Sequence, residues 1–426
     1  MSHVACHLTC AIQLLIHGIG PLREALVEIG RSKKQGNSFL ALLGNFIDDY
    51  HQSHENGSEC CRGDSGAEVG PMDPAQFYKL MKEKTSIDPY EIGDAVTAMR
   101  RILQAIRSAA TGTSPAFDEL FKALLAGKLR QDIVGHKRSL QRIKSKDREM
   151  ACPMAIPGGL ESVELGLAQA TTNRQFINGF DWDQVSNYVE SDLLTDCHHD
   201  TDDGHEGSWE TFKVTRFLSL PRCLLLHLER FSYSSDGSLR PINETVDVHL
   251  TIDMRNYMCD CNSDSSYQYS LEGAILHVLD RDDEDDNEEG GHYVSVHLME
   301  DDTWYLVDDE VVSRIPSVDI PEFLSGRPCT TAGTKHTFIA VLLLYCCRDA
   351  DVSSHMLDRF RTELAEQGQS DEQSLIGKRL MVKWAKEKWY AGVVSGYDET
   401  TGKHSVLYDD GDVREYDLQK KVVKWE

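Results

Sequence analysis

The sequence predicts an α+β fold for most of the chain and a small all-β domain at its C-terminal end. Apolar residues at helical spacing dominate residues 5–50 and 73–131. Runs rich in β-branched and aliphatic residues, typical of strands, follow at 212–231, 246–254 and 338–345. Short β-rich runs separated by tight turns return in residues 375–426, which favours a second, separate sheet.

The helices of the N-terminal third are predicted from apolar residues that recur every three or four positions. In the first helix, Leu8, Ile12, Leu15 and Ile16 fall on one stripe. Further helices are expected at residues 39–50, 74–83, 90–107 and 116–128. Each stripe gives its helix one face to bury against the rest of the domain.

A cysteine lies at the start of the first predicted helix. Cys6 directly precedes the apolar stripe. A thiol at a helix N-terminus is close to amide N–H groups without helical partners and to the positive end of the helix dipole, which favours the thiolate. The sequence therefore predicts a cysteine nucleophile at this position.

A histidine and an aspartate flank a predicted β-hairpin far along the chain. The β-rich runs 293–298 and 303–307 are separated by polar turn residues. His292 opens the first run and Asp308 ends the second, so the hairpin can bring imidazole and carboxylate together. A histidine oriented by a carboxylate is the base half of a nucleophilic triad. Asp309 is the second candidate for the orienting role.

Four motifs, in this order, resemble the ubiquitin-specific proteases, a class of ubiquitin carboxyl-terminal hydrolase. They are the cysteine box at 5–13 with 21–23, the palm strand at 218–221 with 224–231, the strand at 269–277, and the histidine box at 291–293 with 304–309. One such motif alone would be a weak signal, but four in the family order are specific.

This resemblance implies a papain-like cysteine protease fold with a helical thumb, a β palm and fingers, over residues 1–348. It implies that Cys6 attacks the carbonyl after the C-terminal glycine of ubiquitin, that His292 transfers the proton, and that Asp308 orients His292. Amide cleavage also needs a proton donor for the leaving amine and stabilisation of an oxyanion. Ubiquitin or ubiquitinated proteins are the expected partners, and no cofactor is expected.

The chain departs from the family at several positions. An asparagine about five residues before the nucleophile helps to hold the oxyanion in the family, and Met1 stands there in this chain. Either the natural chain extends upstream, or backbone N–H groups alone hold the oxyanion. Only Asp94 and Ala95 match the family pattern Gln-Asp-Ala-x-Glu-Phe. Cys10 replaces a usual serine and is expected to be a structural thiol.

Two alternatives to a ubiquitin protease therefore stay open. The first is a ubiquitin-binding scaffold that kept the fold and lost turnover. The second is a protease for another ubiquitin-like modifier.

Two stretches contain histidines and cysteines that raise the question of zinc. They are His51, His54, Cys60 and Cys61 in residues 51–72, and Cys197, His198, His199 and His205 in residues 132–213. A zinc-binding fingers region needs two Cys-x-x-Cys pairs, and neither stretch supplies them. We expect no bound metal, an exposed loop at 51–72, and a degenerate, metal-free fingers lobe.

A second exposed loop is expected just before the histidine box. Eight of the ten residues at 280–289 are acidic, and such a run repels itself and stays solvated. It is either a mobile insertion or an electrostatic guide for the arginine-bearing tail of ubiquitin.

Composition narrows the class of protein and its location. A formal net charge of −26 argues against direct nucleic-acid binding, which needs clustered Lys and Arg. The 12 cysteines lack disulfide-framework spacing and fit a reduced compartment. No run reaches the roughly 18 apolar residues of a membrane span, and the apolar run 338–347 is expected to be a buried strand. With no basic leader at the N-terminus, the cytoplasm or nucleus is the expected location.

The C-terminal residues form a separate predicted unit. Residues 349–374 are polar, with a short helical pattern at 356–367, and are expected to be a linker. Residues 375–426 resemble a Tudor-type barrel, with three or four short strands.

Tudor-like domains often hold methylated Lys or Arg in an aromatic cage, because ring faces attract a cation stripped of water. The candidates are the aromatic residues Trp384, Tyr390 and Tyr408, with Tyr397 nearby, and the carboxylates Asp410 or Asp412. The alternative is that these aromatic side chains only fill the core of the barrel. A methylated protein is the second expected partner under the first interpretation.

Overall fold

The computed structural model describes most of the chain. It covers residues 6–32, 38–55, 74–88, 93–111, 114–137, 140–192, 209–235, 237, 239–261, 267–279, 292–299, 301–309, 311–327, 337–347, 351–384, 388–398, 400–418 and 420–425. Several predicted features lie outside these residues: Met1, Cys60, Cys61, the 197–205 cluster and the acidic run 280–289.

The chain divides into two compact units. The first comprises Met1–Arg23, Pro74–Ser108 and Glu119–Ser353. The second comprises Glu24–Asp73, Ala109–Asp118 and Ser354–Glu426.

The helices agree with the periodicity of the sequence, with shifted ends. They are α1 (Cys6–Gly18), α2 (Gly20–Arg31), α3 (Phe39–Glu55), α4 (Pro74–Thr85), α5 (Ala95–Ala110), α6 (Pro115–Leu125), α7 (Val163–Ala170), α8 (Ile320–Leu324) and α9 (Asp351–Gln373). His51 and His54 belong to α3 and not to a loop. Among the described residues no single helix is long and apolar enough to cross a membrane, and only the bent pair α1 and α2 passes that test when joined.

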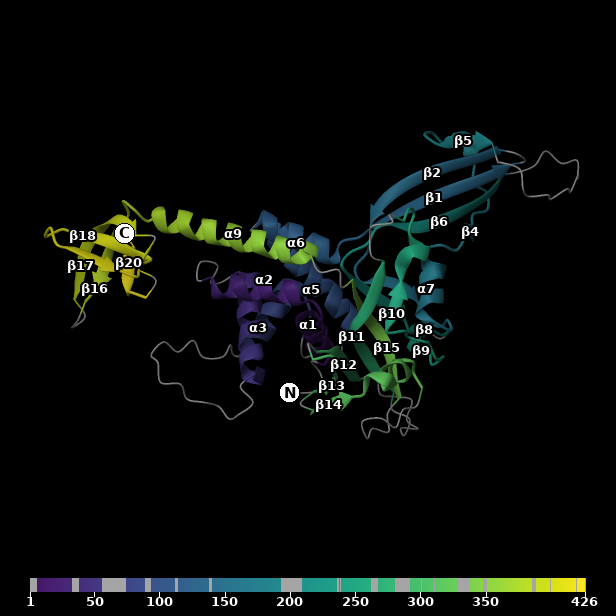
Figure 1. Ribbon diagram of the computed structural model, residues 1–426, viewed down its shortest axis with the longest axis horizontal. Coiled ribbons are helices and arrows are strands. Elements are labelled where there is room, and N and C mark those ends of the chain that lie inside the picture. The colour runs from purple at the N-terminus through teal and green to yellow at the C-terminus, as the bar shows by residue number, and fades with distance from the viewer. Residues whose placement is uncertain are drawn as a thin grey trace, which may run out of the picture. The chain divides into compact units, whose positions relative to one another are not determined.

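An eight-stranded sheet forms the centre of the first unit (Figure 1). Its order is β14 (Val311–Ile315), β13 (Trp304–Asp308), β12 (His292–Leu298), β11 (Gln268–Leu279), β15 (Thr337–Cys347), β7 (Cys223–Glu229) and β3 (Met154–Pro157), with β10 (Thr251–Asp253) also paired to β11. Only the β3–β7 pair is parallel. The predicted hairpin is confirmed as β12 and β13, and α1 packs against β11 and β12.

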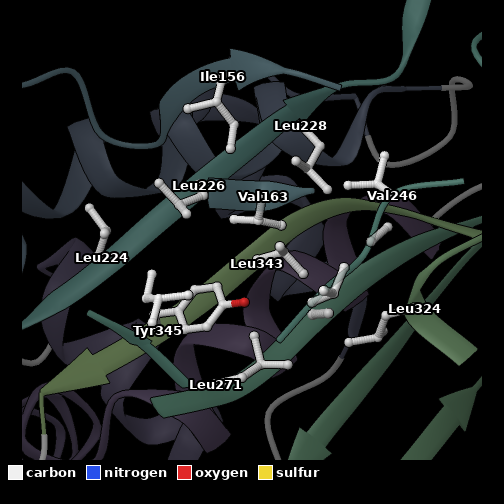
Figure 2. Close-up of a cluster of buried hydrophobic side chains, with 14 of the residues drawn as sticks. Ile156, Val163, Leu224, Leu226, Leu228, Val246, Leu271, Leu324, Leu343 and Tyr345 are labelled. Atoms are coloured by element: carbon white, nitrogen blue, oxygen red, sulfur yellow. The ribbon is translucent and has the colours of Figure 1, made fainter. Parts of the chain in front are cut away.

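The core of this unit lies on the sheet, and Figure 2 shows part of it. Leu224, Leu226 and Leu228 of β7 and Leu343 and Tyr345 of β15 are buried there. Burial of a side chain of this size contributes on the order of 1.5–3 kcal/mol.

The strand expected at 246–254 is shorter than predicted. Only Thr251–Asp253 forms a strand, β10. Val246 and Val248 are nonetheless buried in the same core, 2% and 1% exposed. Burial of irregular backbone therefore accounts for the apolar pattern that suggested a longer strand.

A five-stranded sheet occupies the region expected to be a degenerate fingers lobe. Its order is β4 (Gln175–Phe176), β6 (Glu210–Ser219), β1 (Lys128–Lys137), β2 (Leu140–Glu149) and β5 (Val189–Asp192), and the long strands run side by side in Figure 1. A short two-stranded sheet of β8 (Phe231–Tyr233) and β9 (Leu239–Pro241) follows in the chain.

Aromatic side chains pack together beside this five-stranded sheet. Trp182, 1% exposed, lies within 6 Å, centroid to centroid, of Phe180, Tyr188 and Trp209, at 5.1, 5.9 and 5.7 Å. A Cβ added at Gly135 on β1 would lie 2.3 Å from Trp182 Nε1, so only glycine leaves room for the indole. This cluster gives the strands an apolar anchor.

The second unit contains a five-stranded antiparallel sheet. Its order is β19 (Val413–Tyr416), β18 (Lys403–Tyr408), β17 (Trp389–Asp398), β16 (Arg379–Lys383) and β20 (Val423–Trp425). The three predicted β-rich runs correspond to β16, β17 and β18, and two short strands add to them. Leu380, Val382, Val394 and Val406 are fully buried at its centre.

The segment expected as a linker at 349–374 is mostly one helix, α9. Its apolar residues are few, but Phe360 is fully buried and its ring centroid lies 5.7 Å from that of Phe117. Glu363 accepts a hydrogen bond from the backbone N–H of Ala116 at 2.9 Å. These contacts supply the packing that an isolated polar helix lacks.

Candidate active site

Cys6 is the first residue of α1. Its side chain is buried, with 6% exposed, and the apolar stripe of α1 that includes Leu8 and Ile12 packs into the core. The N–H groups of the first helical turn have no carbonyl partner within the helix, so they favour negative charge on a nearby sulfur. Cys6 therefore lies at a helix start, as the sequence predicts, and its role as the nucleophile stays a prediction.

His292 and Asp308 form a hydrogen-bonded pair at the end of the β12–β13 hairpin. His292 Nε2 lies 2.6 Å from Asp308 Oδ1. The register pairs Ser295 with Val307, so Asp308 faces Val294, two residues from His292 on the same face of β12. The pair is therefore diagonal across the hairpin, a distance that these side chains span.

The pKa of His292 depends on the Cys6 side chain. The Cys6 side chain is the largest influence and raises the pKa of His292 to about 9, with Asp308 adding to the rise and partial burial opposing it. Because Asp308 binds Nε2, Nδ1 is the ring nitrogen left to exchange a proton with the thiol. A thiolate beside an imidazolium is the state that makes a cysteine nucleophilic.

Buried hydrogen bonds hold the cysteine helix in register with the histidine strand. The Cys10 thiol donates to the Tyr293 carbonyl oxygen at 3.4 Å. Ser295 Oγ donates to Gln13 Oε1 at 2.9 Å, and His297 Nε2 lies 2.9 Å from Ser295 Oγ. Complete burial raises the pKa of Cys10 well above its usual value. Cys10 is thus a neutral thiol, as its predicted structural role requires.

The sequence pointed to Asp94 through the family pattern, but not to the contacts it makes at the N-terminus of α5. Asp94 Oδ2 caps α5 by accepting the Thr97 N–H at 2.7 Å, and the Tyr293 hydroxyl donates to Asp94 Oδ1 at 3.5 Å. Next to Asp94, a Cβ at Gly93 would lie 2.6 Å from His7 Nε2. The glycine is a departure from the family pattern that makes room for the buried His7 ring.

Two further histidines of the central sheet stay neutral. Burial, and then the charge of His292, lower the pKa of His277 on β11 to about 4. Burial also lowers the pKa of His227, whose Nδ1 lies 3.1 Å from Arg100 Nη2. His227 is therefore a packed histidine beside Arg100. Neither ring competes with His292 as the base.

The second carboxylate candidate lies at the same place. Asp309 follows β13 with a positive φ of 51°. His292, Asp308 and Asp309 offer ligand atoms within 4.8 Å of one another, the group in the described residues that has the spacing of a metal site. The short His292–Asp308 contact assigns this pair to orienting the imidazole.

The cage candidates of the C-terminal sheet are close together. The Trp384 ring centroid lies 4.9 Å from that of Tyr390 and 5.6 Å from that of Tyr408. Tyr408 is only 4% exposed and belongs to the core, whereas Tyr390 is 39% exposed. Asp410 accepts the backbone N–H of Asp412 at 3.1 Å and so stabilises the turn after β18.

Tyr397 makes a different contact. Its ring stacks on that of His404, with 4.6 Å between centroids. It belongs to the packing around His404 within the second unit.

Comparison with known protein families bears on most of the chain. The family model described as ubiquitin carboxyl-terminal hydrolase matches residues 2–345. The chain belongs to the ubiquitin carboxyl-terminal hydrolase family. The match contains Cys6, His292 and Asp308, and it ends within β15, before α9 and the C-terminal sheet.

Curated members of the ubiquitin carboxyl-terminal hydrolase family resemble the chain at low identity. Ubiquitin carboxyl-terminal hydrolase 9 of Saccharomyces cerevisiae is 23% identical over 318 residues, which is 71% of this chain and 37% of that protein. Probable ubiquitin carboxyl-terminal hydrolase 3 of Schizosaccharomyces pombe is 24% identical over 170 residues, 39% of this chain and 31% of that protein. The chain therefore spans well under half the length of these relatives.

Solved structures of hydrolase-containing assemblies share the fold. The Ubp8-containing SAGA DUB module bound to monoubiquitin matches with a TM-score of 0.55 and 16% identity, covering 80% of this chain and 66% of that one. The same module bound to ubiquitin aldehyde matches with a TM-score of 0.53 and 16% identity, covering 80% and 67%. The palm, fingers and helical region expected from the sequence thus belong to this fold.

Proposed function

We propose that the chain is a deubiquitinating cysteine protease that hydrolyses the peptide or isopeptide bond after the C-terminal glycine of ubiquitin. The observation that carries this proposal is the meeting of Cys6, His292 and Asp308 within a ubiquitin carboxyl-terminal hydrolase domain. The ubiquitin complexes among the similar structures support ubiquitin as the partner.

The reaction follows from the protonation state of the pair. The Cys6 thiolate attacks the carbonyl carbon of the terminal glycine, and the carbonyl oxygen gains the negative charge. Backbone N–H groups at the start of α1, which have no helical carbonyl partner, stabilise this oxyanion. His292, protonated at neutral pH, gives its proton to the leaving amine and leaves a thioester on Cys6.

The second half of the reaction regenerates the enzyme. Neutral His292 takes a proton from water, and the resulting hydroxide attacks the thioester. Ubiquitin leaves with a free carboxylate, and the thiolate–imidazolium pair re-forms. Asp308 keeps the imidazole in the tautomer and orientation that both steps need.

Hydrolysis of a fluorogenic ubiquitin C-terminal amide tests the proposal. We expect turnover by the full chain and none by Cys6→Ala, whereas Cys261→Ser, which changes an exposed thiol, keeps full activity. Ubiquitin binding without hydrolysis in the unmodified chain would favour the scaffold alternative. Faster hydrolysis of another ubiquitin-like modifier, offered as the same type of amide, would favour the second alternative, a protease for that modifier.

For residues 375–426 we propose a Tudor-like recruiting module. Trp384, Tyr390 and Tyr408 supply the ring faces that attract a methylated Lys or Arg side chain of a partner protein. We further propose that residues 1–348 form the catalytic domain and that the protein acts in the cytoplasm or nucleus. Binding of methylated peptides by the full chain, compared with unmethylated peptides, tests the recruiting role.

A further inference from the structure

A charged side chain of the chain itself lies over the proposed cage. The guanidinium carbon of Arg414, on β19, is 4.1 Å from the centroid of the Trp384 ring. This distance is well within the range of a cation–π interaction. The ring that would receive an external cation therefore already holds an internal one.

The surrounding hydrogen bonds fix both partners of this contact. Trp384 Nε1 donates to the Tyr408 hydroxyl at 2.8 Å, and the Tyr408 hydroxyl donates to the Tyr416 hydroxyl at 2.9 Å. Arg414 Nε donates to Asp412 Oδ2 at 2.8 Å. The indole is thus oriented from the core of the sheet, and the guanidinium is held by a carboxylate.

The two partners differ in how easily they can move. Tyr408 is buried, so the indole has a rigid support. The Arg414 and Asp412 side chains are 50% and 46% exposed, and a solvated ion pair of this kind is worth little. Arg414 can therefore leave the ring at low cost while the ring stays in place.

We propose that Arg414 is an internal ligand of this cage, and that the external ligand is a dimethylated arginine side chain which displaces it. This inference rests on the recruiting role proposed for the C-terminal sheet and names its ligand class. The cation that binds is the one whose shape matches the present occupant. A planar guanidinium stacks on the indole and keeps an N–H group to donate to Asp412.

Methylated lysine fits this arrangement less well. A trimethylammonium group is attracted to the ring face but has no N–H to donate. It is also tetrahedral, so it covers less of the indole face than the planar Arg414 guanidinium does now. Dimethylarginine keeps the planar stacking, and its remaining N–H groups can still face Asp412.

Calorimetric titration of the full chain with a peptide carrying asymmetric dimethylarginine tests the proposal. Removal of the internal competitor by Arg414→Gln is expected to tighten binding about two- to fivefold, the range set by an exposed cation–π contact. The matched control is Lys424→Gln, which removes a cation 4.4 Å from a different ring, that of Trp389. This control loses the same charge but should leave the affinity unchanged.

A spectroscopic readout follows Arg414 directly. In NMR spectra of the full chain with isotope-labelled arginine, the side-chain protons of Arg414 are expected to show an upfield ring-current shift. They should lose this shift when the peptide binds. Equal or weaker binding by Arg414→Gln would overturn the displacement while the recruiting role stands. Tighter binding of the trimethyl-lysine peptide would overturn the assignment to arginine. No binding of any methylated peptide to either variant would overturn the recruiting role and this inference together.

Discussion

His292 Nε2 and Asp308 Oδ1 are 2.6 Å apart, at the end of the hairpin that β12 and β13 form. This contact leaves the other ring nitrogen for Cys6, whose helix packs on β12. Two segments nearly three hundred residues apart therefore supply the side chains of the proposed proton transfer.

Loss of the orienting carboxylate is expected to reduce turnover sharply. Asp308→Ala should lower kcat by about 10²-fold or more, because the imidazole loses its fixed orientation. Asp309→Ala is the comparison, since it removes the neighbouring carboxylate and keeps the 2.6 Å contact between His292 and Asp308. Steady-state kinetics on a ubiquitin C-terminal amide measure both. A larger loss in Asp309→Ala would transfer the orienting role to Asp309.

The pH dependence of activity is expected to report His292. Its pKa is raised to about 9, so the imidazolium persists through neutral pH and is lost as the pH rises through about 9. The alkaline limb of kcat/KM should therefore lie near that value. Asp308→Asn should move this limb to lower pH, because a carboxylate that raises the pKa is gone. If the alkaline limb is unchanged in Asp308→Asn, a group other than His292 is responsible for it.

The same shift makes a prediction about stability. A raised folded-state pKa means that the folded chain binds the proton more tightly than the unfolded chain does. The resulting stabilisation is complete below about pH 6.5 and is lost as the pH rises through about 9. Denaturant unfolding of the full chain against His292→Gln should show the difference shrinking over that window. A difference that grows with pH would contradict this sign.

The buried link between α1 and β12 is expected to matter for both folding and rate. Ser295 is fully buried and donates to Gln13, so Ser295→Ala leaves the Gln13 carbonyl without this donor. The expected cost is about 1–3 kcal/mol of unfolding free energy. A fall in kcat with little change in KM should accompany it. The exposed Ser232→Ala is the control and should change neither quantity.

The five-stranded sheet of β1, β2, β4, β5 and β6 is expected to keep its stability without metal. Its anchor in the described residues is the aromatic cluster around Trp182, not a set of cysteine ligands. A chelator should leave the melting temperature unchanged, and Trp182→Ala should cost about 3–5 kcal/mol. Stoichiometric zinc in the purified protein, lost with stability on chelation, would contradict the metal-free prediction.

The three candidate catalytic residues could be predicted from the sequence because each has a local signal. Cys6 begins an apolar stripe, and His292 and Asp308 bracket two β-rich runs. Motif order then relates the two ends of the chain. The hydrogen bonds that hold α1 against β12 could not be predicted. Gln13 and Ser295 are far apart in the sequence, and they meet only because α1 packs on β12 in one particular alignment.

The packing of α9 and the position of Arg414 also depend on contacts that residue spacing in the sequence does not predict. The helix α9 looked like a linker because its surface is polar, and its stability depends on burial of Phe360 beside Phe117. The cage aromatics were identified by type, but the placing of Arg414 over Trp384 follows from how β19 lies in the folded sheet. Pairwise proximity between distant residues is what the structure adds.

The proposed activity requires Cys6 to be the nucleophile toward ubiquitin, and covalent capture measures this most directly. Ubiquitin with an electrophile in place of its terminal glycine carboxylate should add once to the full chain, with intact mass and peptide mapping placing it on Cys6. Cys261→Ser should label equally well, and Cys6→Ala should not label. An adduct that persists in Cys6→Ala, or none on the unmodified chain, would contradict the proposed mechanism.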